Sequence, residues 1–283
     1  MSVYDFGGPT DAPLLHFAHG NGFNGLTYRS ILAPLAERFR LLAWDARGHG
    51  QSALPADPKR LRNWGTYRED LLALIEALGE PLYLAGHSLG GATSLPAAAA
   101  YPGVVRGLLL VEPALFPRAV AAVLSLARLF GLSAKLNPFE AAALRRRHRF
   151  ADRAAMVEYY ADRGMFKTWP RPFIADYVAG GTRPSADGCG IELSTMPEWE
   201  AATFSNPPPQ MLPAFTRYKG PIILLCSAKG STCPPILTRK ITRMNTSVQL
   251  RRIDGTTHFL PMECPDLVRN ALIALMEGQP LAG

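Results

Sequence analysis

Cysteine, lysine and long apolar runs are scarce in this chain of 283 residues. No Cys-x-x-Cys pair and no histidine pair at zinc-ligand spacing occurs, which excludes a disulfide framework and predicts four buried or unreactive thiols: Cys189, Cys226, Cys233 and Cys264. The best candidate for a membrane span, 118–132, is shorter than the roughly 20 residues required and contains Arg128, which excludes a transmembrane helix. Residues 1–8 have neither a basic start nor an apolar stretch, so we expect no signal peptide and a cytoplasmic protein.

Positive charge exceeds negative charge but is spread along the chain. The net charge is +7, carried by 24 arginines and only 6 lysines. The single basic run is 145–149, Arg-Arg-Arg-His-Arg, for which we expect a solvated helix face rather than an anion site, and we expect no binding of nucleic acid. Hydrophobic residues make up 48% of the chain, too much apolar material for a disordered protein. The length suits one large α/β domain, or a core with an inserted module.

Short apolar runs alternate with helical stretches, which is the pattern of a parallel sheet covered on both faces. The predicted strands are 13–19, 41–45, 82–86, 107–112, 222–227 and 247–253. Because these runs are almost continuously apolar, we expect strands buried on both sides. The predicted helices are 28–37, 66–78, the stretch after Leu89, and 266–276. The fold class is therefore α/β, with a mostly parallel, doubly wound sheet.

The alternation stops after Glu112. No strand-like run occurs from 113 to about 204, where we predict an apolar helix at 118–130 and a basic helix at 139–163, followed by loops. Three consecutive prolines, 207–209, then form a stiff linker. We therefore divide the chain into a first core segment, 1–112, an inserted helical cap over the carboxyl edge of the sheet, 113–206, and a second core segment, 207–283.

The motif Gly-x-Ser-x-Gly occurs at 86–90, between a predicted strand and a predicted helix. A strand-to-helix turn this sharp forces Ser88 into a strained backbone with positive φ, and it leaves room only for glycine at Gly86 and Gly90. The Ser88 hydroxyl is then exposed at the start of a helix, where backbone amides favour negative charge. We predict that Ser88 is a nucleophile.

Together with the motifs on either side of Ser88, nearly the whole chain resembles the α/β-hydrolase superfamily. Residues 19–22, His-Gly-Asn-Gly, resemble the oxyanion loop of that family, and 45–52 resemble its Asp-x-Arg-Gly-x-Gly-x-Ser turn. Residues 255–259, Gly-Thr-Thr-His-Phe, resemble the loop that carries the catalytic histidine. The resemblance implies the superfamily fold with a cap, and a nucleophile, an acid and a histidine in that order.

A serine hydroxyl needs a base, and a tetrahedral intermediate needs hydrogen-bond donors. Of six histidines, His258 alone follows the last predicted strand on a loop at the same sheet edge, so we predict that it is the base. His87, beside the nucleophile, is interpreted as a packing or hydrogen-bonding neighbour. The predicted oxyanion donors are the backbone N–H groups of Leu89 and Asn21.

The triad acid is missing from its usual place. The family carries it after the strand at 222–225, but no Asp or Glu occurs from 201 to 253, and Gly230 stands where it would fall. Glu112 ends the preceding strand at the same sheet edge and keeps the order, so we favour it as the acid. The alternatives are that Glu112 is a structural carboxylate, that Asp254 supports the loop of His258, or that a dyad acts without an acid.

These residues predict a serine hydrolase that cleaves a small to medium, partly apolar carboxylic ester through an acyl-enzyme, without cofactor or metal. A thioesterase, a perhydrolase or a carbon–carbon bond hydrolase would use the same groups, and a non-catalytic ligand-binding protein on the same frame is the other alternative. The expected partner is a small acyl substrate. Cap residues that could line an acyl pocket, or simply form the core of the cap, are Phe116, Leu124, Leu129, Phe130, Met165, Phe166, Trp169 and Phe173.

Overall fold

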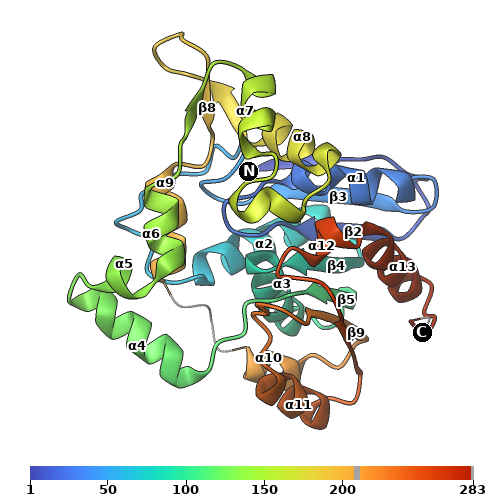
Figure 1. Cartoon of the computed structure of the whole chain (residues 1–283). Coiled ribbons are helices and arrows are strands. Elements are labelled where there is room, and N and C mark those ends of the chain that lie inside the picture. Colours follow the sequence, from blue (N-terminus) through green and yellow to red (C-terminus); the bar gives the residue numbers. More distant parts are fainter. Residues whose placement is uncertain (207–210, 282–283) are drawn as a thin grey trace.

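A computed structural model describes residues 1–206 and 211–281, and a seven-stranded sheet forms its centre (Figure 1). The strands are β1 (Ser2–Asp5), β2 (Leu14–Ala18), β3 (Arg40–Asp45), β4 (Leu82–His87), β5 (Val105–Val111), β9 (Ile222–Ser227) and β10 (Val248–Ile253). Their order is β1-β3-β2-β4-β5-β9-β10, and all neighbours are parallel except β1 and β3. All six predicted strands are present. The sequence missed β1, because four alternately half-buried and exposed residues at a sheet edge are too short a signal.

Helices cover both faces of the sheet, so the predicted α/β class is correct. One face carries α2 (Gly65–Leu78), α3 (Leu89–Ala100), α10 (Leu212–Arg217) and α11 (Pro235–Met244), and the other carries α1 (Arg29–Leu32) and α13 (Pro265–Met276). The predicted helix at 28–37 is shorter than expected. Here α1 lies between two 3₁₀ turns, η1 (Gly25–Tyr28) and η2 (Ala33–Leu35), and Pro34 lacks the N–H that a continuing α-helix needs.

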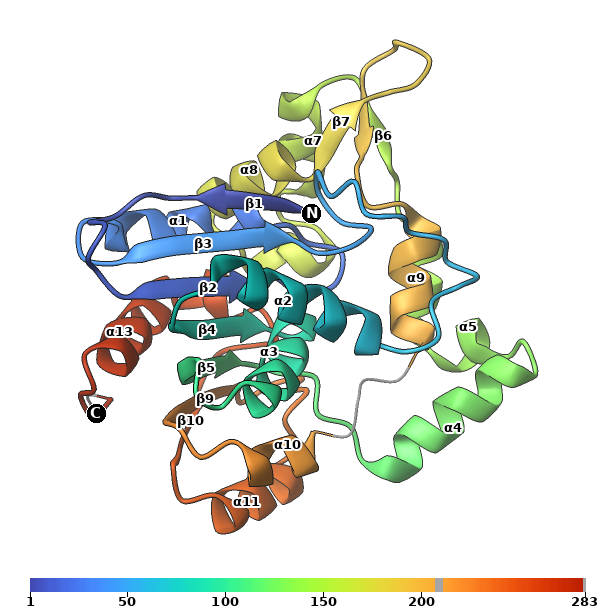
Figure 2. The ribbon, with the colours of Figure 1, turned by 180° about the vertical axis from the view of Figure 1, so that it is seen from behind.

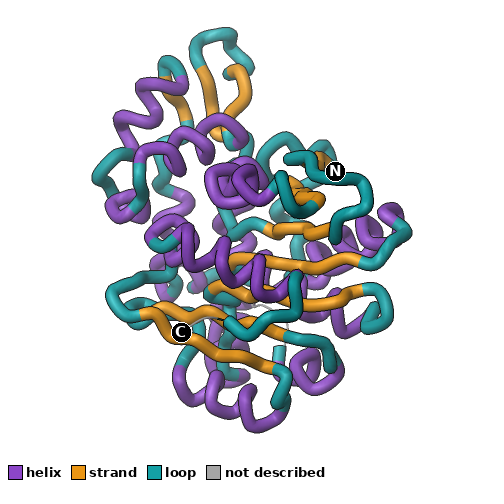
Figure 3. The backbone as a smooth tube through the Cα atoms, turned by 90° about the vertical axis from the view of Figure 1, so that its right-hand side faces the viewer, coloured by secondary structure: helices purple, strands orange, loops and turns teal. Residues whose placement is uncertain are grey.

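The segment between β5 and α10 forms a cap beyond the carboxyl ends of the strands (Figure 2). Its helices are α4 (Arg118–Leu129), α5 (Ser133–Leu136), α6 (Pro138–Leu144), α7 (Arg153–Tyr160), η3 (Gly164–Thr168), α8 (Arg171–Gly180) and α9 (Pro197–Ser205). The cap also contains a small antiparallel sheet, β6 (Arg149–Phe150), β8 (Ile191–Leu193) and β7 (Thr182–Pro184), which lies apart from the stacked strands of the core (Figure 3).

Three expectations for the cap were therefore wrong. The stretch after 163, where only loops were expected, contains η3, α8 and α9. Strands do occur in the cap, but they have two or three residues each and pair only with one another, so no apolar run marks them. The predicted basic helix at 139–163 is interrupted by β6, and α7 begins anew where the Asp152 side chain accepts a hydrogen bond from the Ala155 N–H. The predicted linker prolines, 207–209, lie outside the described residues.

Buried polar contacts fix the cap to the core. The carboxylate of Asp176 in α8 accepts hydrogen bonds from Arg29 Nε at 2.8 Å and from the Ser30 backbone N–H at 3.0 Å. On the other side, the Trp64 indole donates to the carbonyl of Thr203 in α9 at 2.9 Å. The cap thus has a defined position over the sheet edge. Among the described residues, no helix combines the length and the apolar character needed to span a bilayer.

Candidate active site

Ser88 occupies a sharp turn between β4 and α3. Its backbone has φ 54° and ψ −113°, a conformation that residues other than glycine rarely adopt. A Cβ on Gly86 would lie 2.4 Å from the carbonyl carbon of Gly90, and a Cβ on Gly90 would lie 2.0 Å from the carbonyl oxygen of Ala18. Only glycine fits at either position, so the predicted strained turn is confirmed.

The imidazole of His258 lies between Ser88 and Glu112. Its Nε2 is 3.0 Å from Ser88 Oγ, and its Nδ1 is 3.1 Å from Glu112 Oε2. Because a carboxylate only accepts hydrogen bonds, the Nδ1–H donates to Glu112, and Nε2 is left to accept the proton of the serine hydroxyl. The structure thus brings together the three side chains that the sequence singled out, in an arrangement able to deprotonate Ser88.

His258 reaches this place from β10, which is three strands from β4 in the sheet. After β10 the chain turns at Gly255, where φ is 76°, and crosses the sheet edge. The N–H and hydroxyl of Thr257 then donate to the carboxylate of Glu263 at 2.7 and 2.6 Å. These bonds fix the loop immediately before the histidine. Asp254, the alternative acid, is exposed on the same loop.

Glu112 combines a strained backbone with a fully buried side chain. Its φ is 47°, so Ser88 and Glu112 are two of the three non-glycine residues with positive φ in the described part of the chain. Such a conformation costs about 1–3 kcal/mol and persists only where the surroundings fix it, most often at functional sites. The sequence predicted this strain for Ser88 but not for Glu112.

The loop after β9 provides the donors that hold the carboxylate of Glu112. Its Oε1 accepts from the Ser227 N–H at 2.6 Å and the Ser231 hydroxyl at 2.7 Å, and its Oε2 accepts from the Thr232 N–H at 3.0 Å. Burial opposes ionisation, but hydrogen bonds from His258 and Ser231 outweigh it and lower the pKa of Glu112. The loop after β9, where the family carries its acid, therefore supplies in this chain the hydrogen-bond donors that hold Glu112 at the end of the neighbouring strand β5.

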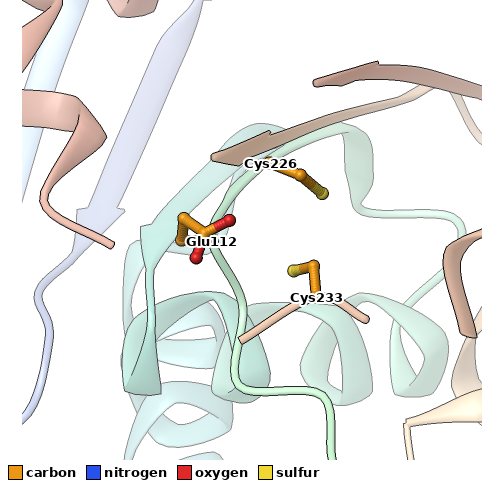
Figure 4. Close-up of side chains that lie close together, drawn as sticks. All are labelled: Glu112, Cys226 and Cys233. Atoms are coloured by element: carbon orange, nitrogen blue, oxygen red, sulfur yellow. The ribbon is translucent and has the colours of Figure 1, made fainter. Parts of the chain in front are cut away.

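Cys226 and Cys233 lie beside Glu112 (Figure 4). Their sulfurs and a carboxylate oxygen are within 4.8 Å of one another, close enough to consider a metal site. The Cys233 thiol, however, donates to the carbonyl of Pro113 at 3.2 Å, and burial raises its pKa well above the usual value, which keeps it protonated. We interpret this group as packing around the acid. Of the four thiols expected to be buried or unreactive, these two are buried, Cys264 is partly exposed and Cys189 is exposed.

The predicted oxyanion donors lie on adjacent loops, because β2 and β4 are neighbours in the sheet. The N–H of Leu89 is the first of α3, so it has no acceptor within the helix. Asn21 lies in a tight turn closed by a hydrogen bond of 3.1 Å from the Phe23 N–H to the Gly20 carbonyl, with Gly22 at φ 76°. The Asn21 side chain donates to the carbonyl of Glu200 in the cap at 3.1 Å, which ties this loop to α9.

A family model described as the alpha/beta hydrolase family matches residues 17–271. The chain belongs to the α/β-hydrolase family. A 2-(acetamidomethylene)succinate hydrolase from Mesorhizobium japonicum is 25% identical over 261 residues, 92% of this chain and 86% of that one. The magnesium-chelatase 30 kDa subunit of Rhodobacter capsulatus is 27% identical over 279 residues, 96% of this chain and 89% of the other. The crystal structure of an E-2-(acetamidomethylene)succinate hydrolase has a TM-score of 0.80 at 24% identity and covers 97% of this chain and 94% of its own.

This α/β hydrolase contains a hydrogen-bond chain that sequence analysis missed. The Gly20 N–H donates to the Tyr28 hydroxyl at 3.2 Å, which donates to His87 Nδ1 at 2.8 Å, and His87 Nε2–H donates to the carbonyl of His258 at 2.8 Å. Burial, followed by the charge of His258, lowers the pKa of His87 to about 3, so the ring stays neutral. His87 is thus the predicted hydrogen-bonding neighbour, and it joins the oxyanion loop to the loop of the base.

Aromatic rings from core and cap surround the histidines of this hydrolase. The ring of Phe259 is 5.7 Å from that of His258, and the ring of Phe23 is 5.9 Å from that of His87. Trp169, from the cap, lies 5.2 Å from Phe23 and 5.8 Å from Phe259. The Trp169 indole N–H is buried and has no hydrogen-bond partner among the described residues. The cap therefore brings apolar surface, with one unpaired donor, next to the base.

The basic run at 145–149 is not a solvated helix face. Arg146 is largely buried, and its guanidinium donates to Glu200 Oε1 at 2.7 Å and to the Tyr177 hydroxyl at 3.2 Å. Burial opposes the charge of Arg146, but the charge of Glu200 raises the pKa of Arg146 overall, whereas burial raises the pKa of Glu200 against the effect of Arg146. The Glu200 carboxylate lies over the oxyanion turn, since a Cβ on Gly22 would be 2.6 Å from Oε1. Residues 145–148 form the turn between α6 and β6, and Arg149 begins β6, so the run forms no helix face.

A cavity of about 480 Å³ lies outside the triad, between the turn at 48–58 and the cap. Its walls include His49, Ser52, Arg183 and Trp199. His49 Nε2 is 3.1 Å from the side-chain oxygen of Asn21, so the cavity is separated from the oxyanion turn by one side chain.

Proposed function

We propose that this hydrolase cleaves small to medium, partly apolar carboxylic esters through an acyl-enzyme on Ser88. The observation that carries the proposal is the pair of contacts of His258, 3.0 Å to Ser88 Oγ and 3.1 Å to Glu112 Oε2. In this arrangement His258 is the general base, and Glu112 keeps it in the required tautomer and stabilises the imidazolium.

The reaction proceeds in two halves. Ser88 Oγ attacks the ester carbonyl while its proton moves to His258 Nε2, and the N–H groups of Asn21 and Leu89 stabilise the oxyanion. His258 gives that proton to the departing alkoxide, which leaves as an alcohol. Water then attacks the acyl-enzyme as His258 accepts its proton, and the acid is released when the proton returns to Ser88 Oγ.

The surroundings of the triad support an uncharged, partly apolar substrate. The rings of Phe23, Trp169 and Phe259 form an apolar wall beside the base. Arg146, the cation next to the oxyanion turn, is matched by Glu200, which leaves no net charge there to attract an anionic group. The cap residues Leu129 and Phe130, which were candidates for this wall, are exposed.

The other functions considered above differ in their support. The non-catalytic interpretation rested on the empty position after β9, and the contact of Glu112 with His258 removes that support. A thioesterase, a perhydrolase or a carbon–carbon bond hydrolase would use the same groups, so none of them is a separate proposal, and the test below compares esters with thioesters.

The test is hydrolysis of p-nitrophenyl esters with acyl chains of two to twelve carbons, compared with acyl-coenzyme A thioesters of the same lengths. We expect the highest kcat/KM for a short or medium ester and the loss of at least 10³-fold in Ser88→Ala. Ser125→Ala, at an exposed serine of α4, is the matched control. A preference for thioesters, or equal rates in Ser88→Ala and wild type, would contradict the proposal.

A further inference from the structure

The cap carries exposed apolar side chains on α4, α5 and the start of α6. Among the described residues, seven large apolar side chains are more than half exposed, and six of them lie between 123 and 139. These six, which we name the apolar face, are Val123, Leu126, Leu129, Phe130, Leu136 and Phe139. Soluble proteins rarely leave so many neighbouring apolar groups in water, and such a face indicates a binding surface.

The apolar face points away from the contacts that hold α4 in place. Ala121 and Ala127 of α4 are buried, and Arg128 donates to the carbonyl of Leu61 at 3.0 Å and contacts the side chain of Asn206. Helices α4 and α5 project from one corner of the molecule (Figures 1 and 2). Phe139 stacks on Phe204 of α9, with the ring centres 5.7 Å apart, but it stays exposed like the other five side chains and can contact a large surface without any rearrangement of the cap.

The charged residues near the apolar face indicate which kind of partner it binds. No Asp or Glu occurs from 113 to 139, and Glu140, the first acidic residue, is buried with its Oε1 bonded to the Ser133 hydroxyl. Lys135, next to Leu136 in α5, and Arg145, at the end of α6, are exposed. Apolar side chains bordered by cations without carboxylates are the pattern of a helix that lies in the interface of an anionic membrane.

A second copy of the chain fits the surface less well. A two-fold contact would place the same cationic border against itself, and the segment supplies no carboxylate to pair with it. We infer that the apolar face docks this hydrolase on the surface of an anionic phospholipid bilayer, with α4 and α5 in the headgroup region. This inference does not depend on the proposed function, because docking is measured without a substrate.

The test is co-sedimentation of the full chain with vesicles of phosphatidylcholine alone or of equal parts phosphatidylcholine and phosphatidylglycerol. We expect binding to the mixed vesicles, at least tenfold weaker binding to phosphatidylcholine alone, and weaker binding at 0.5 M salt. The variant Leu129→Glu with Phe130→Glu should lose at least tenfold in binding. Ile236→Glu, which changes an equally exposed apolar side chain on α11, should bind like wild type.

A second variant distinguishes a loss of vesicle binding from a loss of folding. Lys135→Glu alters one exposed charge and should lower binding to the mixed vesicles severalfold, with an unchanged thermal unfolding midpoint. Equal binding by wild type and the Leu129→Glu, Phe130→Glu variant, or no binding to the mixed vesicles, would overturn the inference. A wild-type dimer in solution that this double variant converts to a monomer would replace the membrane with a second copy.

Discussion

Replacing Glu112 with glutamine removes the charge that faces His258 while keeping the length of the side chain. The Nδ1–H of His258 then faces either a neutral carbonyl oxygen or an NH₂ group, and the imidazolium formed during catalysis loses its partner. Loss of the orienting carboxylate in a serine triad lowers turnover by about 10⁴-fold. At about 1.36 kcal/mol for each factor of ten, this corresponds to about 5.4 kcal/mol of transition-state stabilisation.

The same substitution has a predictable effect on stability. Each carboxylate oxygen accepts two hydrogen bonds, from Ser227 and Ser231 on one side and from Thr232 and His258 on the other. Whichever way the amide is oriented, its NH₂ faces two donors, and a buried donor left without an acceptor costs about 1–3 kcal/mol. We expect Glu112→Gln to fold with a lower free energy of unfolding.

The assay is steady-state hydrolysis of p-nitrophenyl acetate at pH 8, with urea unfolding as the check on folding. Asp254→Asn is the matched control, because Asp254 is an exposed carboxylate four residues from His258 and should leave kcat unchanged. A folded Glu112→Gln variant with kcat within tenfold of wild type would refute the role of Glu112. A large loss in Asp254→Asn would move the acid to the loop of the base.

Three further outcomes are expected. Gly22→Ala places an L side chain at φ 76° and against the carboxylate of Glu200, which should shift the oxyanion turn. We expect kcat/KM to fall by about 10²-fold, and an unchanged kcat/KM would exclude the turn from catalysis. Tyr28→Phe leaves the Gly20 N–H and His87 Nδ1 without hydrogen-bond partners. Urea unfolding should show a free energy of unfolding lower by about 2–4 kcal/mol, and an unchanged value would show that these bonds do not stabilise the protein. Burial, followed by the charge of a neighbouring histidine, lowers the pKa of His16 to about 3, so the unfolded chain binds the extra proton between about pH 6.5 and 3 and stability falls as the pH falls, by about 1.4 kcal/mol per unit. Because other buried histidines, such as His87, add slopes of the same sign, His16→Leu should reduce the wild-type slope by about 1.4 kcal/mol per pH unit in urea titrations from pH 7 to 4.5, and equal slopes would contradict it.

The strands and the turn at Ser88 were predictable because their determinants are local. A strand buried on both faces must be apolar at nearly every position, and a nucleophile turn needs glycine on both sides of the serine. The absence of acidic residues from 201 to 253 was equally visible and directed attention to Glu112. A further signal was present there, since Ser231 and Thr232 supply donors where the family places its acid.

What the sequence did not show depends on contacts between distant segments. Arg146 is buried because Glu200, 54 residues later, lies against it, and no local pattern distinguishes it from the exposed arginines beside it. The bond between Tyr28 and His87 joins residues 59 positions apart. The strands of the cap are too short to show the alternation of apolar and polar residues that predicts a strand. In each case the partner, rather than the residue itself, determines the environment.

The central claim is that His258 makes the hydroxyl of Ser88 a nucleophile. The most direct measurement is covalent labelling with a fluorophosphonate, followed by mass analysis of the labelled peptide. The account predicts one phosphonyl group on Ser88 in the wild-type protein, no labelling of Ser88→Ala, and labelling of His258→Ala slowed by at least 10³-fold. A folded protein that never takes up the reagent, or that carries it on another residue, would contradict the account.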